Sequence, residues 1–153
     1  MRSESASVSN GTFFTEAEDC GIDFSYLNGT TGKALMVEST GGGCAWLDYD
    51  RDGWPDLYLV QGGDPAAPSE ETRPIDFLYR NMGAGSFMNV TSAISIEEHG
   101  YGQGAAAADY DNDGFEDLFI TNVGFNVLLH NQGDGSFEPV VLDASAGRLW
   151  STS

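Results

Sequence analysis

Two short loops of the sequence carry aspartates at alternate positions. The first loop reads DYDRDGWPD from Asp48 to Asp56, and the second reads DYDNDGFED from Asp109 to Asp117. In a tight loop such side chains can point at one centre, and the glycine in the sixth place permits the reversal of the chain. Carboxylates that converge without a cation repel one another strongly. Each loop therefore predicts a site for a hard divalent ion.

Ca²⁺ fits these loops best, because it accepts about six to eight oxygen ligands in flexible geometry, whereas Mg²⁺ requires a strict octahedron. Zinc prefers cysteine or histidine, and neither loop contains one. In each loop we expect the ligands to be the four carboxylates and the backbone carbonyl of the aromatic residue after the glycine. The predicted ligands are Asp48, Asp50, Asp52, Trp54 and Asp56 in the first loop, and Asp109, Asp111, Asp113, Phe115 and Asp117 in the second. The sequence thus predicts two calcium sites.

An EF-hand loop starts with the same spacing of acids, but it requires a bidentate glutamate in the twelfth place and helices on both sides. The twelfth residue is Leu59 in the first loop and Ile120 in the second, and strand-like runs flank both loops. The EF-hand interpretation fails on both counts. The other alternative is a pair of solvated acidic turns. Agreement of the two copies at all four acids and at the glycine disfavours it.

The two loops belong to an internal repeat, which is a stronger guide to the fold than any local pattern. A second shared block follows each loop: LYRNMGAGSF from Leu78 to Phe87, and LLHNQGDGSF from Leu128 to Phe137. The distance from loop to block is 11 residues longer in the first copy. The difference falls on 63–75, a stretch rich in Pro, Ser and Glu that we expect to form an inserted surface loop.

Each copy predicts short strands separated by glycine turns, because small, apolar or alternating runs flank the loop and the shared block. The expected strands are 44–47, 57–60, 77–80 and 87–90 in the first copy, and 105–108, 118–121, 127–130 and 137–141 in the second. Four antiparallel strands in about 50–60 residues are typical of one β-propeller blade. The predicted fold is therefore all-β, a partial propeller of about two blades, each a four-stranded antiparallel meander, with flanking strands.

This repeat divides the chain into four expected parts. Residues 1–42 are a lead-in with a partial blade strand, and residues 43–91 are the first blade with its insertion at 63–75. Residues 92–141 are the second blade, and residues 142–153 begin a truncated third blade. Because a blade buries its faces against its neighbours, we expect the remaining blades of a parent propeller to be partners of this segment.

Charge and composition exclude several classes of partner. The 153 residues contain 24 acidic and 6 basic side chains, for a formal net charge of −18, so nucleic acid is excluded as a partner. No run approaches the roughly 20 apolar residues of a membrane-spanning helix, so we expect no membrane insertion. With 41% hydrophobic residues the chain can bury a core despite its charge. Cys20 and Cys44 leave two alternatives, one disulfide or two small buried thiols.

No pattern in the sequence brings a nucleophile together with a base, so we predict that the chain is not an enzyme. Its two histidines are far apart in the sequence. His130 takes the place that Arg80 has in the other copy, which indicates a residue on the surface of a strand rather than a catalyst. We expect five aromatic side chains to pack between blades rather than to bind sugar: those of Trp46, Trp54 and Phe115, and those of the GSF turns, Phe87 and Phe137.

Several segments resemble FG-GAP/VCBS-type repeats, the blade unit of integrin-α-like β-propellers. They are GGGCAWLDYDRDGWPDLYLV and YGQGAAAADYDNDGFEDLFITN around the loops, together with the two shared blocks. With the lead-in FTEAEDCGIDFSYLNGTTGK, the chain more closely resembles the N-terminal part of the cartilage-acidic-protein-like family, whose bacterial members often end in an ASPIC/UnbV domain. The resemblance implies a seven-bladed propeller with Ca²⁺ in the blade loops, usually extracellular or periplasmic. The chain departs from that family in its length and contains no segment similar to ASPIC/UnbV.

The loops and the resemblance together predict a calcium-binding β-propeller segment of an extracellular, periplasmic or cell-surface protein. Its role is expected to be structural, adhesive or ligand-binding, with Ca²⁺ stabilising the blades and a protein or a carbohydrate as the ligand. The alternative is an accessory or catalytic propeller domain of a larger carbohydrate-active enzyme, such as a polysaccharide lyase. A cluster of His, Tyr and Arg at the tops of the blades would favour that alternative, and two histidines are too few to build it.

Overall fold

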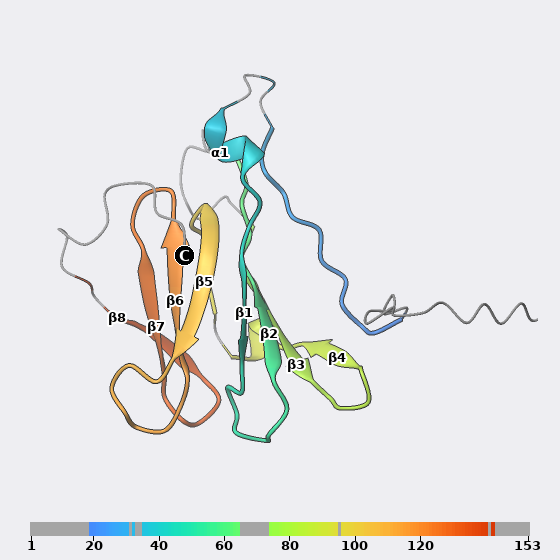
Figure 1. The fold of residues 1–153 in the computed structure, drawn as a ribbon, viewed down its shortest axis with the longest axis vertical. Coiled ribbons are helices and arrows are strands. Elements are labelled where there is room, and N and C mark those ends of the chain that lie inside the picture. The colour runs from blue at the N-terminus through green and yellow to red at the C-terminus, as the bar shows by residue number, and fades with distance from the viewer. Residues whose placement is uncertain are drawn as a thin grey trace, which may run out of the picture.

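The computed structural model describes residues 19–30, 32, 35–64, 74–94, 96–140 and 142 of the chain. The elements follow in the order α1 (Met36–Ser39), β1 (Cys44–Leu47), β2 (Asp56–Leu59), β3 (Phe77–Asn81), β4 (Phe87–Asn89), a 3-10 turn (Thr91–Ala93), β5 (Gly102–Ala108), β6 (Asp117–Asn122), β7 (Val127–Asn131) and β8 (Phe137–Val140). The strands form two four-stranded antiparallel sheets, β1-β2-β3-β4 and β5-β6-β7-β8 (Figure 1). Within the described ranges no helix has the length and apolar character to span a membrane.

This arrangement confirms the predicted all-β fold, because the two antiparallel meanders are consistent with two propeller blades. The strands begin and end within one residue of the predicted positions, with one exception. β5 begins at Gly102, three residues before the expected start. Its pairing with β6 continues past an irregularity between Gly102 and Gly104, and glycine tolerates the local bend of such a bulge.

Three predicted parts of the chain lie wholly or mostly outside the described residues. They are the first part of the lead-in at 1–18, the central part of the insertion at 65–73, and 143–153, where the third blade was expected to begin. Both cysteines are described. Both are free thiols, which supports the unpaired alternative, but they are not buried as expected, because Cys20 is half-buried and Cys44 is exposed.

The hydrophobic core lies between the two sheets. Side chains alternate between the faces of a strand, and one face of the first sheet packs against one face of the second. The first sheet contributes Ala45, Leu47, Tyr58 and Leu78, and the second contributes Ala105, Leu118, Ile120, Leu129 and Phe137. The inner strands β1 and β5 lie side by side, whereas β4 and β8 lie at opposite edges of the molecule (Figure 1). The core is therefore the boundary between two blades.

The second sheet presents its other face away from the first sheet, and we call this surface the outward face. Each of its apolar residues has a counterpart in the first copy that is buried under the second sheet. The outward face consists of Ala106, Ala108, Phe119, Leu128 and Val140, all exposed or half-buried, and the buried counterparts are Ala45, Leu47, Tyr58, Leu78 and Val90. The outward face thus has the composition of a blade boundary, and none of the described residues covers it completely.

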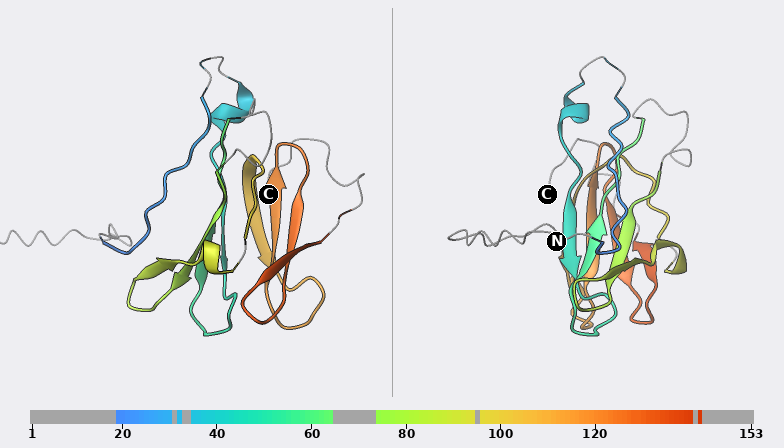
Figure 2. Two further views of the ribbon diagram at one scale, coloured as in Figure 1. Left: turned by 180° about the vertical axis from the view of Figure 1, so that it is seen from behind. Right: turned by 90° about the vertical axis from the view of Figure 1, so that its right-hand side faces the viewer.

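Residues 20–24 of the lead-in lie beside β3 and β4, on the face of the first sheet that points away from the second sheet (Figures 1 and 2). The backbone amide of Phe87 donates to the carbonyl of Cys20 at 2.7 Å. The hydroxyl of Tyr79 donates to the carbonyl of Asp23 at 2.8 Å. The lead-in is therefore attached to the first blade, although its described part is not assigned to a strand.

Candidate metal centre

The two acidic loops lie at the same end of the molecule, where each one joins the first two strands of its sheet (Figure 1, lower edge). We call residues 48–56 loop 1 and residues 109–117 loop 2. Antiparallel pairing places the ninth residue of each loop, Asp56 or Asp117, opposite the last residue of the preceding strand. The strand ladder therefore fixes both ends of each loop.

The backbone of each loop enters the left-handed region at two positions. Gly53 and Gly114, in the sixth place, have φ values of 86° and 94°, which glycine adopts without steric cost. Arg51 and Asn112, in the fourth place, have φ values of 58° and 62°. For residues other than glycine this conformation costs about 1–2 kcal/mol. The predicted reversal at the glycine is present, and the matching values show that the two loops follow the same path.

The aspartates hold this path by accepting hydrogen bonds from amides of their own loop. In the first place, Asp48 Oδ2 accepts from the amide of Gly53 and Asp109 Oδ2 accepts from the amide of Gly114, both at 3.0 Å. The fifth-place aspartates accept from the amide two residues later, at 2.9 Å in loop 1 and 2.8 Å in loop 2. Bonds of this type are the usual reason that aspartate is favoured in turns.

The ninth-place aspartates anchor the loops to the rest of their sheets. Asp56 and Asp117 are almost completely buried, and each accepts two backbone amides. The donors are Tyr49 at 3.2 Å and Asn81 at 2.7 Å in loop 1, and Tyr110 at 3.0 Å and Asn131 at 2.8 Å in loop 2. Burial raises the pKa of Asp56 to about 6, although its two amide bonds lower it. The ionised carboxylate is therefore costly in this position, and a cation beside it would offset that cost.

Three carboxylates converge in each loop. Oxygens of Asp48, Asp50 and Asp56 lie within 4.8 Å of one another, and so do oxygens of Asp109, Asp111 and Asp117. Ca²⁺ holds its oxygen ligands at about 2.3–2.6 Å, so two ligands on opposite sides of one ion are about 5 Å apart. The spacing within each cluster therefore suits a single calcium ion.

One oxygen of Asp48 provides a separate test of this fit. Asp48 Oδ1 is buried and has no hydrogen-bond partner within the described part of the chain, while Oδ2 is bonded to the amide of Gly53. A buried carboxylate oxygen without a partner is costly, and a cation at the cluster would supply that partner. The residues present in loop 1 therefore fit the calcium ion that the sequence predicts.

Arg80, on β3, forms ion pairs with loop 1, and no pattern within the loop predicted this contact. Its Nε lies 2.6 Å from Asp50 Oδ2, and its Nη2 lies 2.9 Å from Asp52 Oδ2. Asp52 faces the guanidinium and does not belong to the cluster of the other three carboxylates. The ion pairs neutralise part of the charge of loop 1 and attach it to β3.

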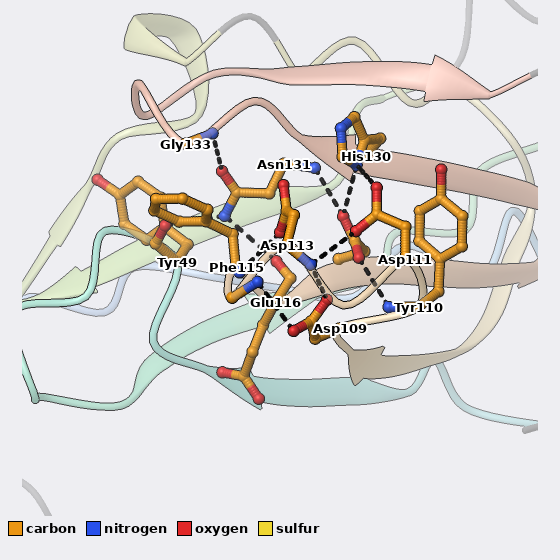
Figure 3. Close-up of polar contacts among 12 residues, drawn as sticks. Tyr49, Asp109, Tyr110, Asp111, Asp113, Phe115, Glu116, His130, Asn131 and Gly133 are labelled. Carbon is orange, nitrogen blue, oxygen red and sulfur yellow. Dashed lines mark hydrogen bonds and ion pairs between the residues drawn. The ribbon is translucent and has the colours of Figure 1, made fainter.

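His130 occupies the matching place beside loop 2 (Figure 3). Its Nδ1 lies 3.0 Å from Asp117 Oδ1 and 3.5 Å from Asp111 Oδ2, and it forms a further cluster with Asp111 and Asp113. Neither loop contains a histidine of its own, but β7 brings an imidazole to loop 2. Loop 2 therefore has an imidazole nitrogen within reach of its aspartates, although its own nine residues include none. One feature of the sequence could have indicated both Arg80 and His130: each lies directly before the asparagine of the repeated block.

The aromatic residues in the seventh place of the loops differ in their surroundings. The ring of Phe115 lies under the guanidinium of Arg51 from the other loop, at 5.1 Å from its centroid, as expected of a residue between blades. Trp54 is 53% exposed, and Trp46 on β1 is 55% exposed. The amides of Trp54 and Phe115 donate to the fifth-place aspartates, and the metal-binding role of their carbonyls stays a prediction.

Comparison with known protein families agrees with the internal repeat. The family model described as an FG-GAP-like repeat matches residues 48–120. The match begins at the first aspartate of loop 1 and ends within β6, so it includes both acidic loops. No curated protein matches the chain. Residues 48–120 of this chain are therefore an FG-GAP-like repeat segment.

Proposed function

We propose that the chain is a calcium-binding pair of β-propeller blades in which each acidic loop holds one structural Ca²⁺. The observation that carries this proposal is the convergence of three carboxylates in each loop. A buried oxygen of Asp48 without a partner in the described residues supports it, and so does the match of 48–120 to an FG-GAP-like repeat. When bound, Ca²⁺ supplies positive charge and coordination, with no redox chemistry.

The chain's own residues explain what such ions would stabilise. Asp48, Asp50 and Asp56 would hold one ion, and Asp109, Asp111 and Asp117 would hold the other, with the fifth-place aspartates and the two carbonyls as the remaining predicted ligands. Each loop joins the first two strands of its sheet, so neutralising its carboxylates keeps those strand ends together. The effect is large in a chain whose net charge is −18, because repulsion between acids destabilises the compact state.

We also propose that the segment acts without catalysis in an extracellular, periplasmic or cell-surface protein, in a structural, adhesive or ligand-binding role. Calcium sites of extracellular modules typically have dissociation constants of about 10⁻⁴–10⁻³ M, and such sites fill only where calcium is abundant. The exposed position of loop 2 is consistent with a site of this kind. The resemblance of the sequence to the cartilage-acidic-protein-like family supports the same location.

The outward face supports a further part of the proposal, that the remaining blades of a parent propeller are partners of this segment. Its residues match those that the first sheet buries under the second sheet. A third sheet with the same sequence pattern would cover the outward face in the same way.

Calorimetric titration of the full chain with Ca²⁺ tests the calcium sites. We expect two ions per chain, and we expect the combined variant Asp50→Ala with Asp111→Ala to bind none, because each substitution removes a central carboxylate of its cluster. Since an ion that binds only the folded state stabilises it, EDTA should also lower Tm. If the calcium concentration was a hundredfold above the Kd of a site, emptying that site lowers the free energy of unfolding by about 2.7 kcal/mol.

Asp134→Ala is the matched control for the titration. Asp134 is an exposed acid in the turn before β8, and its counterpart in the first copy is Ala84. The control removes one negative charge without touching either loop, so it should still bind two ions. Undiminished binding in the double variant, or an equal loss in the control, would show that the aspartates of the loops are not the ligands.

A further inference from the structure

Residues of the second blade hold the start of loop 1. The backbone amide of Asp48, the first predicted ligand, donates to Glu116 Oε2 at 2.7 Å. The carbonyl of Tyr49, the next residue, accepts from Nδ2 of Asn131 at 2.8 Å. Figure 3 shows Tyr49, Glu116 and Asn131 together beside the aspartates of loop 2. The path of the first two residues of loop 1 therefore depends on side chains of the neighbouring blade.

The same two side chains belong to the framework of loop 2. Glu116 is the eighth residue of loop 2, directly before the buried Asp117. Asn131 is fully buried; its amide donates to Asp117 Oδ1 at 2.8 Å, and its Nδ2 also donates to the carbonyl of Glu116 at 3.2 Å. Its Oδ1 accepts from the amide of Gly133 at 3.0 Å. With all these partners, Asn131 is fixed relative to loop 2.

Ring contacts add further links between the loops. The guanidinium of Arg51, in the fourth place of loop 1, lies 5.1 Å from the ring centroid of Phe115, in the seventh place of loop 2. The ring of Tyr49 lies 6.3 Å from that of Phe137, the first residue of β8. Cation–π and aromatic pairs of this kind are favourable and directional. Loop 1 is thus attached to the second blade at its first, second and fourth residues.

Within the described residues, the first blade makes no equivalent connection from its own loop to another blade. The counterpart of Glu116 in loop 1 is Pro55, which has no carboxylate to accept an amide. The counterpart of Asn131 is Asn81, whose Nδ2 donates to the carbonyl of Pro55 within its own blade at 2.9 Å. Glu116 is therefore a feature of the second copy that the repeat alone does not explain.

We propose that the two loops bind calcium cooperatively, with Glu116 and Asn131 acting as positioning residues that transmit the state of loop 2 to loop 1. This inference rests on the proposed calcium binding and adds how one site regulates the other. An ion in loop 2 holds residues 115–117 in place, and with them the acceptor for the amide of Asp48. Loop 1 then loses less conformational freedom when its own ion binds. The effect is reciprocal, so an ion in loop 1 favours binding in loop 2 by the same factor.

Electrostatics alone predicts the opposite result, which makes the sign of the cooperativity informative. Two divalent cations in neighbouring loops repel each other, so without the connection the second ion binds more weakly than the first. Calorimetric titration of the full chain with Ca²⁺ should instead show a second step at least about fivefold stronger than the first after statistical correction.

Two substitutions at Glu116 separate the hydrogen bond from the charge. Glu116→Ala removes the acceptor for the amide of Asp48, and we expect this variant to bind two ions without positive cooperativity. Glu116→Gln removes the same negative charge but keeps an oxygen that can accept this amide, and we expect it to stay cooperative. A purely electrostatic role of Glu116 would instead make the two variants alike.

Amide NMR on the variant Asp50→Ala tests the connection without altering Glu116. This substitution disables loop 1, so added Ca²⁺ loads only loop 2. We expect loading to shift the amide resonances of Asp48 and Tyr49 in the disabled loop. We expect no such shift on addition of Ca²⁺ to Asp50→Ala combined with Asp111→Ala, in which both clusters are disrupted.

The outcomes distinguish failure of calcium binding from failure of the coupling between the two loops. No calcium binding by the unaltered chain overturns both the proposed function and the cooperativity. Two ions bound in independent or mutually weakening steps, with an unchanged Asp48 amide in the Asp50→Ala variant, overturn the cooperativity and leave the proposed function intact. Full cooperativity in Glu116→Ala overturns the role assigned to Glu116.

Discussion

Asp76 lies outside both acidic loops, directly before β3, and only 1% of it is exposed. Its carboxylate accepts the hydroxyl of Tyr58 at 2.7 Å and the amide of Gln61 at 2.6 Å. Burial raises the pKa of Asp76 to about 8; the two hydrogen bonds lower it, and the nearby carboxylate of Glu98 raises it further. The folded protein therefore keeps a proton on Asp76 at pH values at which the unfolded chain has released it.

Asp76→Asn should flatten the dependence of stability on pH. Between about pH 4 and about pH 8 the folded state binds more protons than the unfolded state, so the free energy of unfolding falls as pH rises through this window. The variant has no carboxyl at position 76 to titrate. Its free energy of unfolding should therefore exceed that of the unaltered chain by the largest amount near pH 8. Urea unfolding of both proteins in calcium-free buffer measures the two profiles, in which the titration of Asp56 is common to both. Parallel profiles of the free energy of unfolding against pH would contradict the raised pKa of Asp76.

The turns before β4 and β8 are equivalent elements of the two blades, but they have different neighbours. Gly83 and Gly133 are counterparts with positive φ values of 76° and 74°. A Cβ atom on Gly83 would lie 3.8 Å from the ring of Trp54, which is an ordinary contact. A Cβ atom on Gly133 would lie 2.7 Å from the ring of Phe115, which must then move. The turn of the second blade is thus packed directly against loop 2.

Gly133→Ala should therefore destabilise the protein more than Gly83→Ala. Both substitutions force alanine into the left-handed region, at a cost of about 1–2 kcal/mol. Gly133→Ala also displaces Phe115, and overpacking of this type costs about 1–3 kcal/mol more. Urea unfolding of both variants in the same calcium-free buffer gives the comparison. An equal decrease in the free energy of unfolding in the two variants would mean that the ring of Phe115 has room to shift.

Local patterns were sufficient to predict most strands and the path of both loops. Alternation of apolar residues locates the strands. The hydrogen bond from the amide of Gly53 to Asp48 joins residues only five positions apart in the sequence. The partners from other elements could not be predicted in this way. Arg80 reaches loop 1 across 28 residues of sequence, and Glu116 reaches Asp48 across 68. Such contacts depend on strand register and on the packing of one sheet against another, which no local spacing specifies.

The outward face determines how the whole molecule should behave in solution. An apolar sheet face that the described residues leave uncovered favours association. Light scattering of the unaltered chain should therefore detect species larger than a monomer. Phe119→Lys places a charge in the middle of this face and should reduce association. Phe125→Lys is the control, because Phe125 is a 57% exposed aromatic residue in the turn after β6. A compact monomer, or an equal effect of both variants, would contradict this expectation.

The spacing of the inner strands has a geometric consequence for any larger stack of such sheets. A Cβ atom on Gly43, next to β1, would lie 2.5 Å from the Cα of Gly104 on β5, so the two sheets nearly touch along their inner edges. Farther out, larger side chains such as Tyr49 and Phe137 separate them. The two sheets therefore form a wedge, and further sheets packed in the same way would bend into an arc. A bulkier residue in place of Gly104 would widen the narrow side, flatten the arc and increase the number of sheets needed to complete a circle.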